Sequence, residues 1–246
     1  MDSSVLIVLL SAVLPALALL YFIYRKDDLR KEPAKQIVRA FLLGVASALL
    51  AIFLNSLLLL FGFYSEEPAT VGGHLLEAFF GAALPEELAK LALLLLFLRR
   101  NPDFDEWVDG IVYAASLGLG FAALENIFYL FDNLDDWAAV GTLRAFLSIP
   151  AHFFFAVTMG YFVSRAFFGD PAKVRWNLAL ALICPVILHT LFDFPLMLSR
   201  TAEITGGLFA LFCGVFIFMA VKSKEFYLAH HARDAEQMNQ DHGASA

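Results

Sequence analysis

The sequence is poor in charge. Asp, Glu, Lys and Arg together make up 17% of its 246 residues, whereas 60% of the residues are hydrophobic. A soluble domain averages about 25% charged and about 45–50% apolar residues. A water-soluble fold could not hide this much apolar surface in its core, and the mean hydropathy of +0.72 agrees with that. We therefore expect a protein whose solvent is the lipid bilayer.

Cysteine and clustered basic residues are also scarce. Cys184 and Cys213 both lie in apolar runs, which is typical of small buried side chains and not of a disulfide framework or a metal-binding pair. The net charge is −7, and no stripe of Lys and Arg suits phosphate binding, so nucleic acid is not expected as a partner. The sequence also contains no P-loop and no glycine motif for dinucleotides. The first apolar run lacks the basic start and the cleavage site of a signal peptide, so we expect it to be retained as a span.

Long apolar runs follow one another along the whole chain. A helix needs about 20 apolar residues to cross a bilayer. A helix satisfies its own backbone hydrogen bonds, so it can cross the lipid core without leaving polar groups unpaired. The apolar runs in this chain are too long for the strands of a β-barrel. We predict an all-α, polytopic transmembrane helical bundle in the cell membrane with about seven spans. These are 4–24, 37–63, 74–98, 108–131, 143–168, 176–198 and 205–222.

Basic residues lie almost entirely on one side of the predicted spans. Loops on the cytoplasmic side carry an excess of Lys and Arg. Of the 17 basic residues, all fall in connections on the side of the C-terminus except Lys90, Arg144 and Arg200. This pattern predicts an outward N-terminus and a cytoplasmic C-terminus. We expect residues 1–222 to form one seven-span domain and residues 223–246 to form a polar, flexible cytoplasmic tail.

The third predicted span contains two adjacent carboxylates, Glu86 and Glu87, with Lys90 one turn later. Ionisable residues in a span are costly and therefore suggest function. Lys90 is within reach of either glutamate on one helix face. A structural ion pair with Lys90 would explain one of the two glutamates but would leave the other unexplained. We expect one of the two glutamates to act as a general base, and the sequence leaves open which one.

Three further predicted spans carry ionisable residues. Glu125 shares a helix face with Tyr129 and has no cation nearby in its own helix, so it needs a partner on another span. His152 lies in the fifth span. His189 lies in the sixth, and Asp193 follows it by one turn, where a carboxylate can orient an imidazole. Asp109, close to the start of its span, is expected to be only a helix-start residue.

The ionisable residues of these four spans fall at a similar predicted depth. At about 1.5 Å of rise per residue from the outer end of each span, Glu86 lies about 18 Å deep, Glu125 about 10 Å, and His152 and His189 about 14 Å. These differences are within the uncertainty of the span boundaries. Residues that serve only local packing have no reason to coincide in depth. We therefore predict a single site in the outer half of the bilayer.

Four short sequence blocks, taken together, resemble the PrsW family of intramembrane proteases, within the wider superfamily of CAAX prenyl proteases and Abi proteins. The loop 27–33 also resembles the first cytoplasmic loop of that family, so the resemblance covers about residues 20–200. In the wider superfamily the second block usually ends in His, whereas here it has Glu125, as in the PrsW branch. The blocks are Glu86-Glu87-x-x-Lys90, Phe121-x-x-x-Glu125-Asn126-x-x-Tyr129, His152 ahead of Gly160-Tyr161, and His189-x-x-x-Asp193.

The resemblance implies proteolysis of a membrane-anchored protein substrate, and the family's known theme is an anti-sigma factor trimmed on its outward side. In our hypothesis, Glu125, His152 and His189 bind a divalent metal such as zinc, or they act directly as oxyanion stabilisers and proton shuttles in a glutamic mechanism. Both versions remain open. The expected catalytic residues are Glu86, Glu87, Glu125, His152, His189 and Asp193, supported by Lys90, Asn126 and Tyr129.

Two other classes of function would use the same residues. A proton-coupled transporter also needs intramembrane Glu and His, although the sequence shows no inverted repeat or pair of interrupted helices. A non-catalytic membrane scaffold descended from proteases would keep the fold without the chemistry. Intramembrane proteolysis is the reading that we favour.

Overall fold

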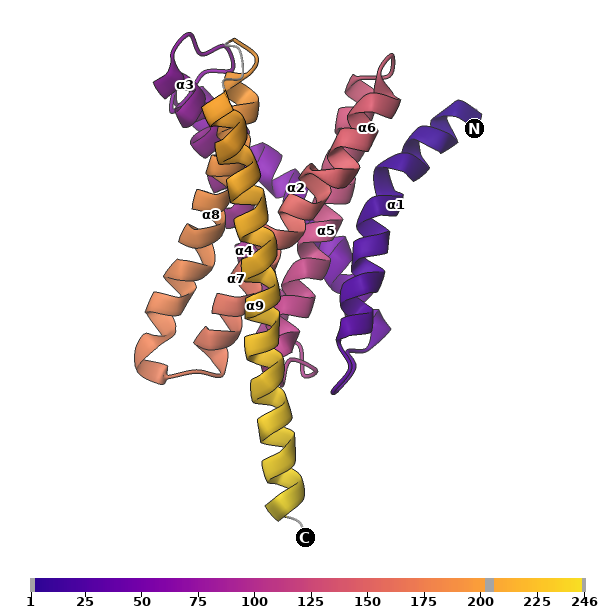
Figure 1. The fold of residues 1–246 in the computed structure, drawn as a ribbon, viewed down its shortest axis with the longest axis vertical. Coiled ribbons are helices and arrows are strands. Elements are labelled where there is room, and N and C mark those ends of the chain that lie inside the picture. Colours follow the sequence, from indigo (N-terminus) through magenta and orange to yellow (C-terminus); the bar gives the residue numbers. More distant parts are fainter. Residues whose placement is uncertain (1–2, 202–205, 245–246) are drawn as a thin grey trace.

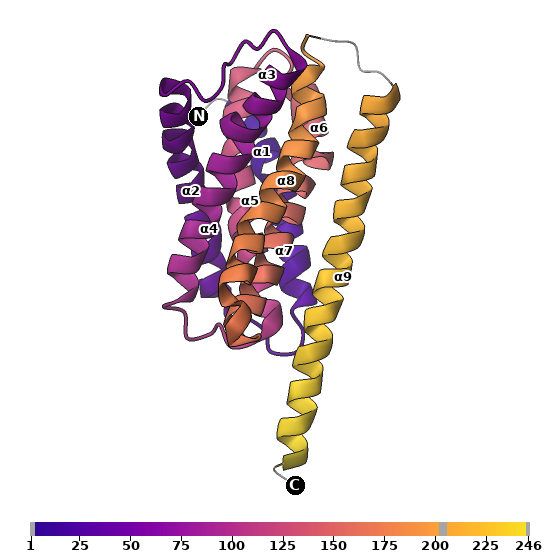
Figure 2. The same ribbon diagram turned by 90° about the vertical axis from the view of Figure 1, so that its left-hand side faces the viewer.

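The protein, seen here in a computed structural model, is a bundle of long helices (Figures 1 and 2). The structure describes residues 3–201 and 206–244. Within these ranges the regular elements are all helices, which confirms the predicted all-α class. In chain order they are α1 (Ser3–Lys26), α2 (Ala34–Leu60), α3 (Val71–Leu76), the π-helix η1 (Glu77–Ala83), α4 (Leu84–Leu98), α5 (Trp107–Asp132), α6 (Trp137–Phe146), α7 (Ser148–Phe167), the 3₁₀ helix η2 (Pro171–Lys173), α8 (Val174–Leu198) and α9 (Gly206–Ala244).

Six helical stretches in the described chain are long and apolar enough to cross a membrane. The predicted span 74–98 is not one of them, because its residues are divided among α3, η1 and α4, which follow one another without a break. π-Helical turns are rare and are frequently found at functional sites. The six stretches are Val5–Lys26, Ala34–Leu60, Trp107–Asp132, Trp137–Phe167, Pro171–Leu198 and Gly206–Gln240.

The central helix is α5, which packs against α1, α2, α7 and α9. It is apolar on all sides, as expected for a helix surrounded by other helices. Glycines allow its neighbours to approach closely. Gly120 of α5 lies against the carbonyl of Phe41 in α2, and Gly160 of α7 lies against the carbonyl of Gly110 in α5. A side chain at either glycine would collide with backbone atoms, so these contacts fix the spacing of the bundle.

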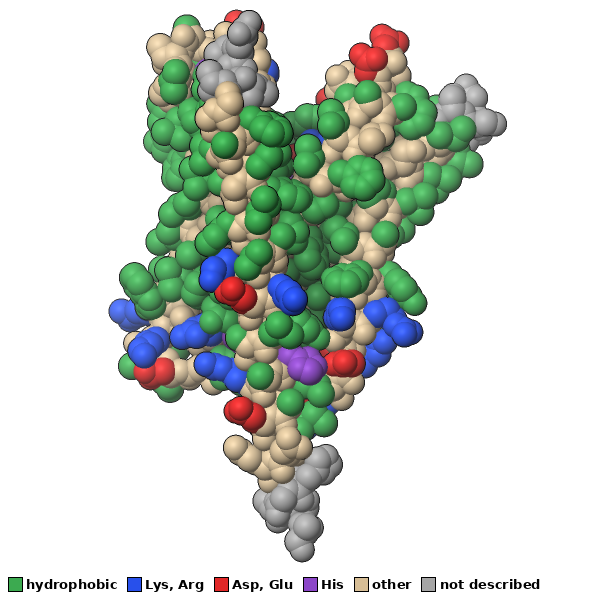
Figure 3. Space-filling model, in the orientation of Figure 1, with side chains coloured by type: hydrophobic (Ala, Val, Ile, Leu, Met, Phe, Trp, Pro, Cys, Tyr) green, Lys and Arg blue, Asp and Glu red, His purple; other side chains and the backbone are tan. Residues whose placement is uncertain are grey.

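The bundle divides into two arms at the end where α3 and α6 lie (Figure 1). One arm carries α3, η1 and the adjoining end of α8, and the other carries α5, α6 and the start of α1. The space-filling view shows a hollow between them, with apolar side chains on its walls (Figure 3). Lys and Arg gather toward the opposite end of the molecule in the same view. That is the end which the sequence analysis assigns to the cytoplasm.

The segment predicted to be a polar tail is helical as far as the structure describes it. Helix α9 continues to Ala244, and its polar half contacts the bundle through residues up to Asp234 and then projects beyond it (Figure 2). The imidazole of His230 lies 3.0 Å from the carbonyl oxygen of Tyr161, and Asp234 accepts the backbone N–H of Trp107 at 2.8 Å. Polar residues in a terminal segment are normally solvated, so the sequence gives no sign that free backbone N–H groups at the start of α5 bind Asp234.

Candidate active site

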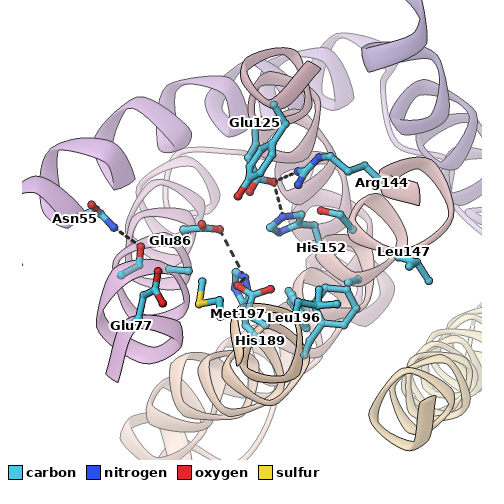
Figure 4. A pocket seen from close by; sticks show the side chains of 18 of the residues that line it. Asn55, Glu77, Glu86, Glu125, Arg144, Leu147, His152, His189, Leu196 and Met197 are labelled. Atoms are coloured by element: carbon cyan, nitrogen blue, oxygen red, sulfur yellow. Dashed lines mark hydrogen bonds and ion pairs between the residues drawn. The ribbon is translucent and has the colours of Figure 1, made fainter. Parts of the chain in front are cut away.

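The hollow between the arms is a cavity of about 560 Å³ (Figure 4). Its lining comes from η1 and from helices α4, α5, α6, α7 and α8, with Asn55 of α2 on one side. The residues predicted as catalytic meet here. Five of the six line the cavity directly, and the sixth, Glu87, is buried and contacts His189. The five are Glu86, Glu125, His152, His189 and Asp193.

The ammonium group of Lys90 lies at the centre of the polar cluster. Its Nζ is 2.8 Å from Glu87 Oε1, 3.3 Å from Glu86 Oε2 and 3.1 Å from His152 Nδ1. It also lies 3.8 Å from the ring centre of Phe121, a cation–π contact. The lysine side chain is only 1% exposed, so these partners replace its water. One cation therefore holds together two carboxylates of α4 and a histidine of α7.

The contacts of His152 determine which of its ring nitrogens carries the proton. An ammonium group can only donate hydrogen bonds, so His152 Nδ1 must accept from Lys90. The proton of the neutral ring is then on Nε2, which donates to Glu125 Oε2 at 2.8 Å. Both sides of the ring are thus fixed, one by Lys90 and the other by Glu125.

His189 is held by carboxylates on both sides. Its Nδ1 lies 3.0 Å from Glu87 Oε1, and its Nε2 lies 3.1 Å from Asp193 Oδ2, the contact expected for a carboxylate that orients an imidazole. The ring stacks on Phe155 with centres 4.5 Å apart, and it meets His152 edge-on at 5.3 Å. The two imidazoles are therefore neighbours at the base of one cavity, on α7 and α8.

The charged residue nearest to the predicted catalytic cluster that was not predicted is Arg144. Glu125 was expected to need a partner on another span, and besides His152 it has Arg144 of α6, whose Nη2 lies 2.7 Å from Glu125 Oε2 (Figure 4). Arg144 stood at the edge of a predicted span, where an arginine is inexpensive, and it was counted only toward the orientation of the chain. The signal that could have found it is its rarity as a basic residue on the acidic, outward side.

Further polar residues, neutral and charged, form the outer wall of the cavity and were also not predicted as site residues. The amide nitrogen of Asn55 donates to the carbonyl of Gly81 in the π-helix, and its oxygen accepts from the Tyr64 hydroxyl at 2.8 Å. Arg200 binds Glu77 at 2.6 Å on the same side of the cavity. These bonds attach the π-helical turn to α2 and to the end of α8.

The donor atoms of the cluster suit a divalent metal. Glu86, Glu87, His152 and His189 can each offer one atom within 4.8 Å of the others, and carboxylates with imidazoles are typical zinc ligands. Glu87 Oε2 is buried and has no hydrogen-bond partner in the described part of the chain. The set expected from the sequence had Glu125 in place of the two adjacent glutamates. The structure instead pairs Glu125 with Arg144 and His152.

Comparison with known proteins gives a consistent result. Residues 32–221 match the family model described as PrsW family intramembrane metalloprotease. The chain is 37% identical over 192 residues to Protease PrsW of Clostridioides difficile (strain 630), with 77% of this chain and 79% of the relative covered. It is 36% identical over 187 residues to Protease PrsW of Bacillus subtilis (strain 168), covering 76% and 81%.

A third relative, Protease PrsW of Geobacillus kaustophilus (strain HTA426), is 37% identical over 201 residues, which cover 82% of this chain and 84% of the relative. No solved structure matches. The range matched by the family model contains every predicted site residue as well as Arg144. These comparisons favour intramembrane proteolysis over the transporter and the scaffold.

Proposed function

Because this chain belongs to the PrsW family of intramembrane metalloproteases, we propose that it cuts a membrane-anchored protein at the cavity between its two arms. The chain is a multi-pass membrane protein and an intramembrane endopeptidase. The observation that supports the proposed site is the meeting of Glu, His and Asp side chains from α4, α5, α7 and α8 around one cavity. With the predicted orientation, this cavity lies in the outer half of the bilayer.

We assign the role of general base to Glu86 and not to Glu87. Glu86 lines the cavity and its side chain is 15% exposed, whereas the Glu87 side chain is fully buried between Lys90 and His189. A base must reach the water that it activates. In the proposed step Glu86 takes a proton from a water molecule, and the oxygen of that water attacks the scissile carbonyl carbon. Glu87 holds Lys90 and His189 in place.

In the version without a metal, His152 and His189 stabilise the oxyanion that forms, and Glu86 passes the proton that it took from water to the leaving amine. Both rings line the cavity, and each has its orientation fixed by a carboxylate, Glu125 for His152 and Asp193 for His189. Donors that are already aligned before the reaction contribute most to stabilising charge in the transition state. The Asp193 and Glu125 contacts thus serve to prepare these two histidines.

Glu87, His152 and His189 would hold a metal ion if Glu86 remains free as the base. Three protein ligands of this kind leave an open position, as in catalytic zinc sites. A bound divalent ion supplies Lewis-acid polarisation of the scissile carbonyl. The Lys90 ammonium already bonds to Glu87 and His152, so it must move aside for the ion.

Metal analysis of purified, active enzyme tests this part of the proposal. We expect bound metal in the active protein, loss of cleavage after treatment with a chelator, and recovery when zinc is returned. Full cleavage by metal-free enzyme would end the metal version and leave the glutamic version, in which the same residues act without an ion.

The substrate class that we propose is a single-pass anti-sigma factor cut on its outward side. It follows from the family resemblance together with the predicted outward position of the cavity. In the experiment, each single-pass anti-sigma factor of the source organism is tagged at its cytoplasmic end and produced together with the protease. A shortened form should appear with the wild type and not with Glu86→Gln. If every anti-sigma factor stays intact while other membrane proteins are cut, this substrate class is wrong and the proteolytic activity stands.

A further inference from the structure

We infer that Arg144 is a positioning residue of the active site and that the block Glu125-Asn126-x-x-Tyr129 forms the cradle that holds it. The inference rests on the proposed function, because the residue it positions is His152. It also assigns one common role to Glu125, Asn126 and Tyr129, which is to bind Arg144.

Arg144 contacts every named residue of that block. Its Nη2 donates to Glu125 Oε2 at 2.7 Å, its Nε donates to Asn126 Oδ1 at 2.8 Å, and its guanidinium carbon lies 3.8 Å from the ring centre of Tyr129. The amide of Asn126 is itself fixed, because its nitrogen donates to the carbonyl of Ala12 in α1 at 2.8 Å. A planar group with several donors and a stacking face fits this cradle, and lysine would not.

Arg144 acts on the active site through a single carboxylate oxygen. Glu125 Oε2 accepts from both Arg144 Nη2 and His152 Nε2, and the opposite side of the His152 ring accepts from Lys90. The imidazole is therefore held in a chain of four charged or polar side chains that runs from α6 to α4. Without Arg144, Glu125 would lose the partner that fixes its position, and the hydrogen bond from His152 Nε2 that orients the ring would weaken, although Lys90 would still hold the proton on Nε2.

A purely structural role for Arg144, as the attachment of α6 to α5, explains the contacts less well. Helix α6 already packs through Trp137 and Val140 against the apolar residues Ile127 and Leu130 of α5. Arg144 is only 13% exposed and lines the cavity, so its charge is removed from water at a cost that an apolar residue would avoid. Its hydrogen bonds to Glu125 and Asn126 offset this desolvation cost, and they fix Glu125 next to His152.

The first test reads the His152 ring directly and needs no substrate. Full-length protein labelled with ¹⁵N-histidine is studied by NMR in lipid, and His152→Gln identifies the signal. The wild type should show a ring protonated at Nε2 and unprotonated at Nδ1. Arg144→Gln should keep this protonation pattern but shift the Nε2 signal, because the hydrogen bond from Nε2 to Glu125 is no longer held in place, whereas Arg175→Gln, which removes an exposed arginine on α8, should leave the His152 signals unchanged. An unchanged His152 signal in Arg144→Gln would overturn the inference.

The second test measures cleavage in proteoliposomes, with a single-pass protein cut by the wild type in cells as the probe. Loss of a residue that orients a catalytic side chain typically costs about 10–100-fold in activity. We expect Arg144→Gln to lower kcat by about that factor with little change in KM, and Arg144→Lys to recover part of the loss. Adding Arg144→Gln to Glu125→Gln should cost little more, because both act through one contact.

The outcomes separate this inference from the proposed function. Wild-type kcat in Arg144→Gln, or losses that multiply fully in the double variant, would overturn the positioning role while proteolysis stands. If neither the wild type nor any variant cuts any protein, the proposed function fails. The His152 signals would then still decide whether Arg144 orders the ring.

Discussion

The two ends of this bundle both bury carboxylates, but they satisfy them in different ways. In the arms, the carboxylates bind cationic side chains and border an open cavity. Glu86 and Glu87 share the ammonium of Lys90, and Glu125 binds Arg144. Each of these charges is balanced by a partner, and two of the three glutamates, Glu86 and Glu125, line the cavity, where a ligand can reach them.

At the opposite end, the carboxylates bind mainly backbone N–H groups. Asp109 accepts from the backbone of Glu106 at 2.7 Å, and Asp234 of α9 accepts from that of Val108 at 2.9 Å. Glu106 and Asp109 form a capping box at the start of α5, which confirms that Asp109 is a helix-start residue. Burial of a carboxylate therefore does not by itself identify an active site. The distinguishing features are cationic partners on other helices and an adjoining cavity.

The largest difference between the two ends should be the loss of kcat when a buried carboxylate is replaced. Glu86→Gln removes the proposed base and should lower kcat by ~10²–10⁴-fold. Glu32→Gln, at the other end, keeps an oxygen that can accept from the Tyr113 hydroxyl and should leave kcat within about twofold. Both variants are assayed at matched amounts of folded protein. Equal losses of kcat in the two variants would contradict the distinction between catalytic carboxylates at the cavity and structural carboxylates at the opposite end.

In the half of the bundle opposite the cavity, stability should be most sensitive to substitutions that add volume between closely packed helices. Gly160→Ala places a methyl group against the Gly110 carbonyl and within 2.7 Å of Ile111 Cα. Overpacking of this kind typically costs ~1–3 kcal/mol, so Tm in detergent should fall. Gly214→Ala on α9, where a Cβ meets nothing within 4 Å, is the matched control. A Tm for Gly160→Ala equal to that of the control would show that the helices can separate there without cost.

Docking of α9 should contribute a smaller, purely structural effect. Asp234→Ala leaves the backbone N–H groups of Trp107 and Val108 without their acceptor. Loss of a cap costs about 1 kcal/mol, so Tm should drop by a few degrees while kcat is kept. Glu236→Ala, at an exposed position two residues later, should change neither. A fall in kcat in Asp234→Ala but not in Glu236→Ala would mean that α9 affects the active site as well as the stability of the fold.

The last expected effect is a dependence of stability on pH. Burial and the neighbouring Asp109 carboxylate raise the pKa of Glu32, which lies in the loop between α1 and α2, to about 10. A raised pKa means that the folded state binds a proton that the unfolded state releases, so stability falls as pH rises between about 4.5 and 10. The Tm of the wild type should therefore decline from pH 7 to 9, and Glu32→Gln should flatten that decline. An identical slope in both proteins would contradict this assignment.

The sequence predicted most of the site because ionisable residues are conspicuous in apolar runs. The Glu86–Glu87 pair and the His189–Asp193 pair stood out individually, whereas His152 was weak alone and was connected to them by its common depth. Asn55 and Tyr64 did not stand out, because neutral polar residues are inexpensive near the ends of spans. Their role depends on the π-helical turn, which no hydropathy pattern predicts.

Two features of the fold were beyond sequence reasoning for a related reason. An apolar run such as 74–98 looks the same whether it forms one straight helix or the series α3, η1 and α4. The docking of α9 depends on backbone groups at the start of α5, which are present in every sequence and so give no signal.

The most direct test of the central claim is a comparison of the N-termini of membrane proteins in cells of the source organism. One strain carries the wild type, and the other carries Glu86→Gln/Glu87→Gln at matched expression. The account predicts new termini near the outer face of the membrane that appear only with the wild type and that identify the substrates. Identical sets of termini under several envelope stresses would contradict it.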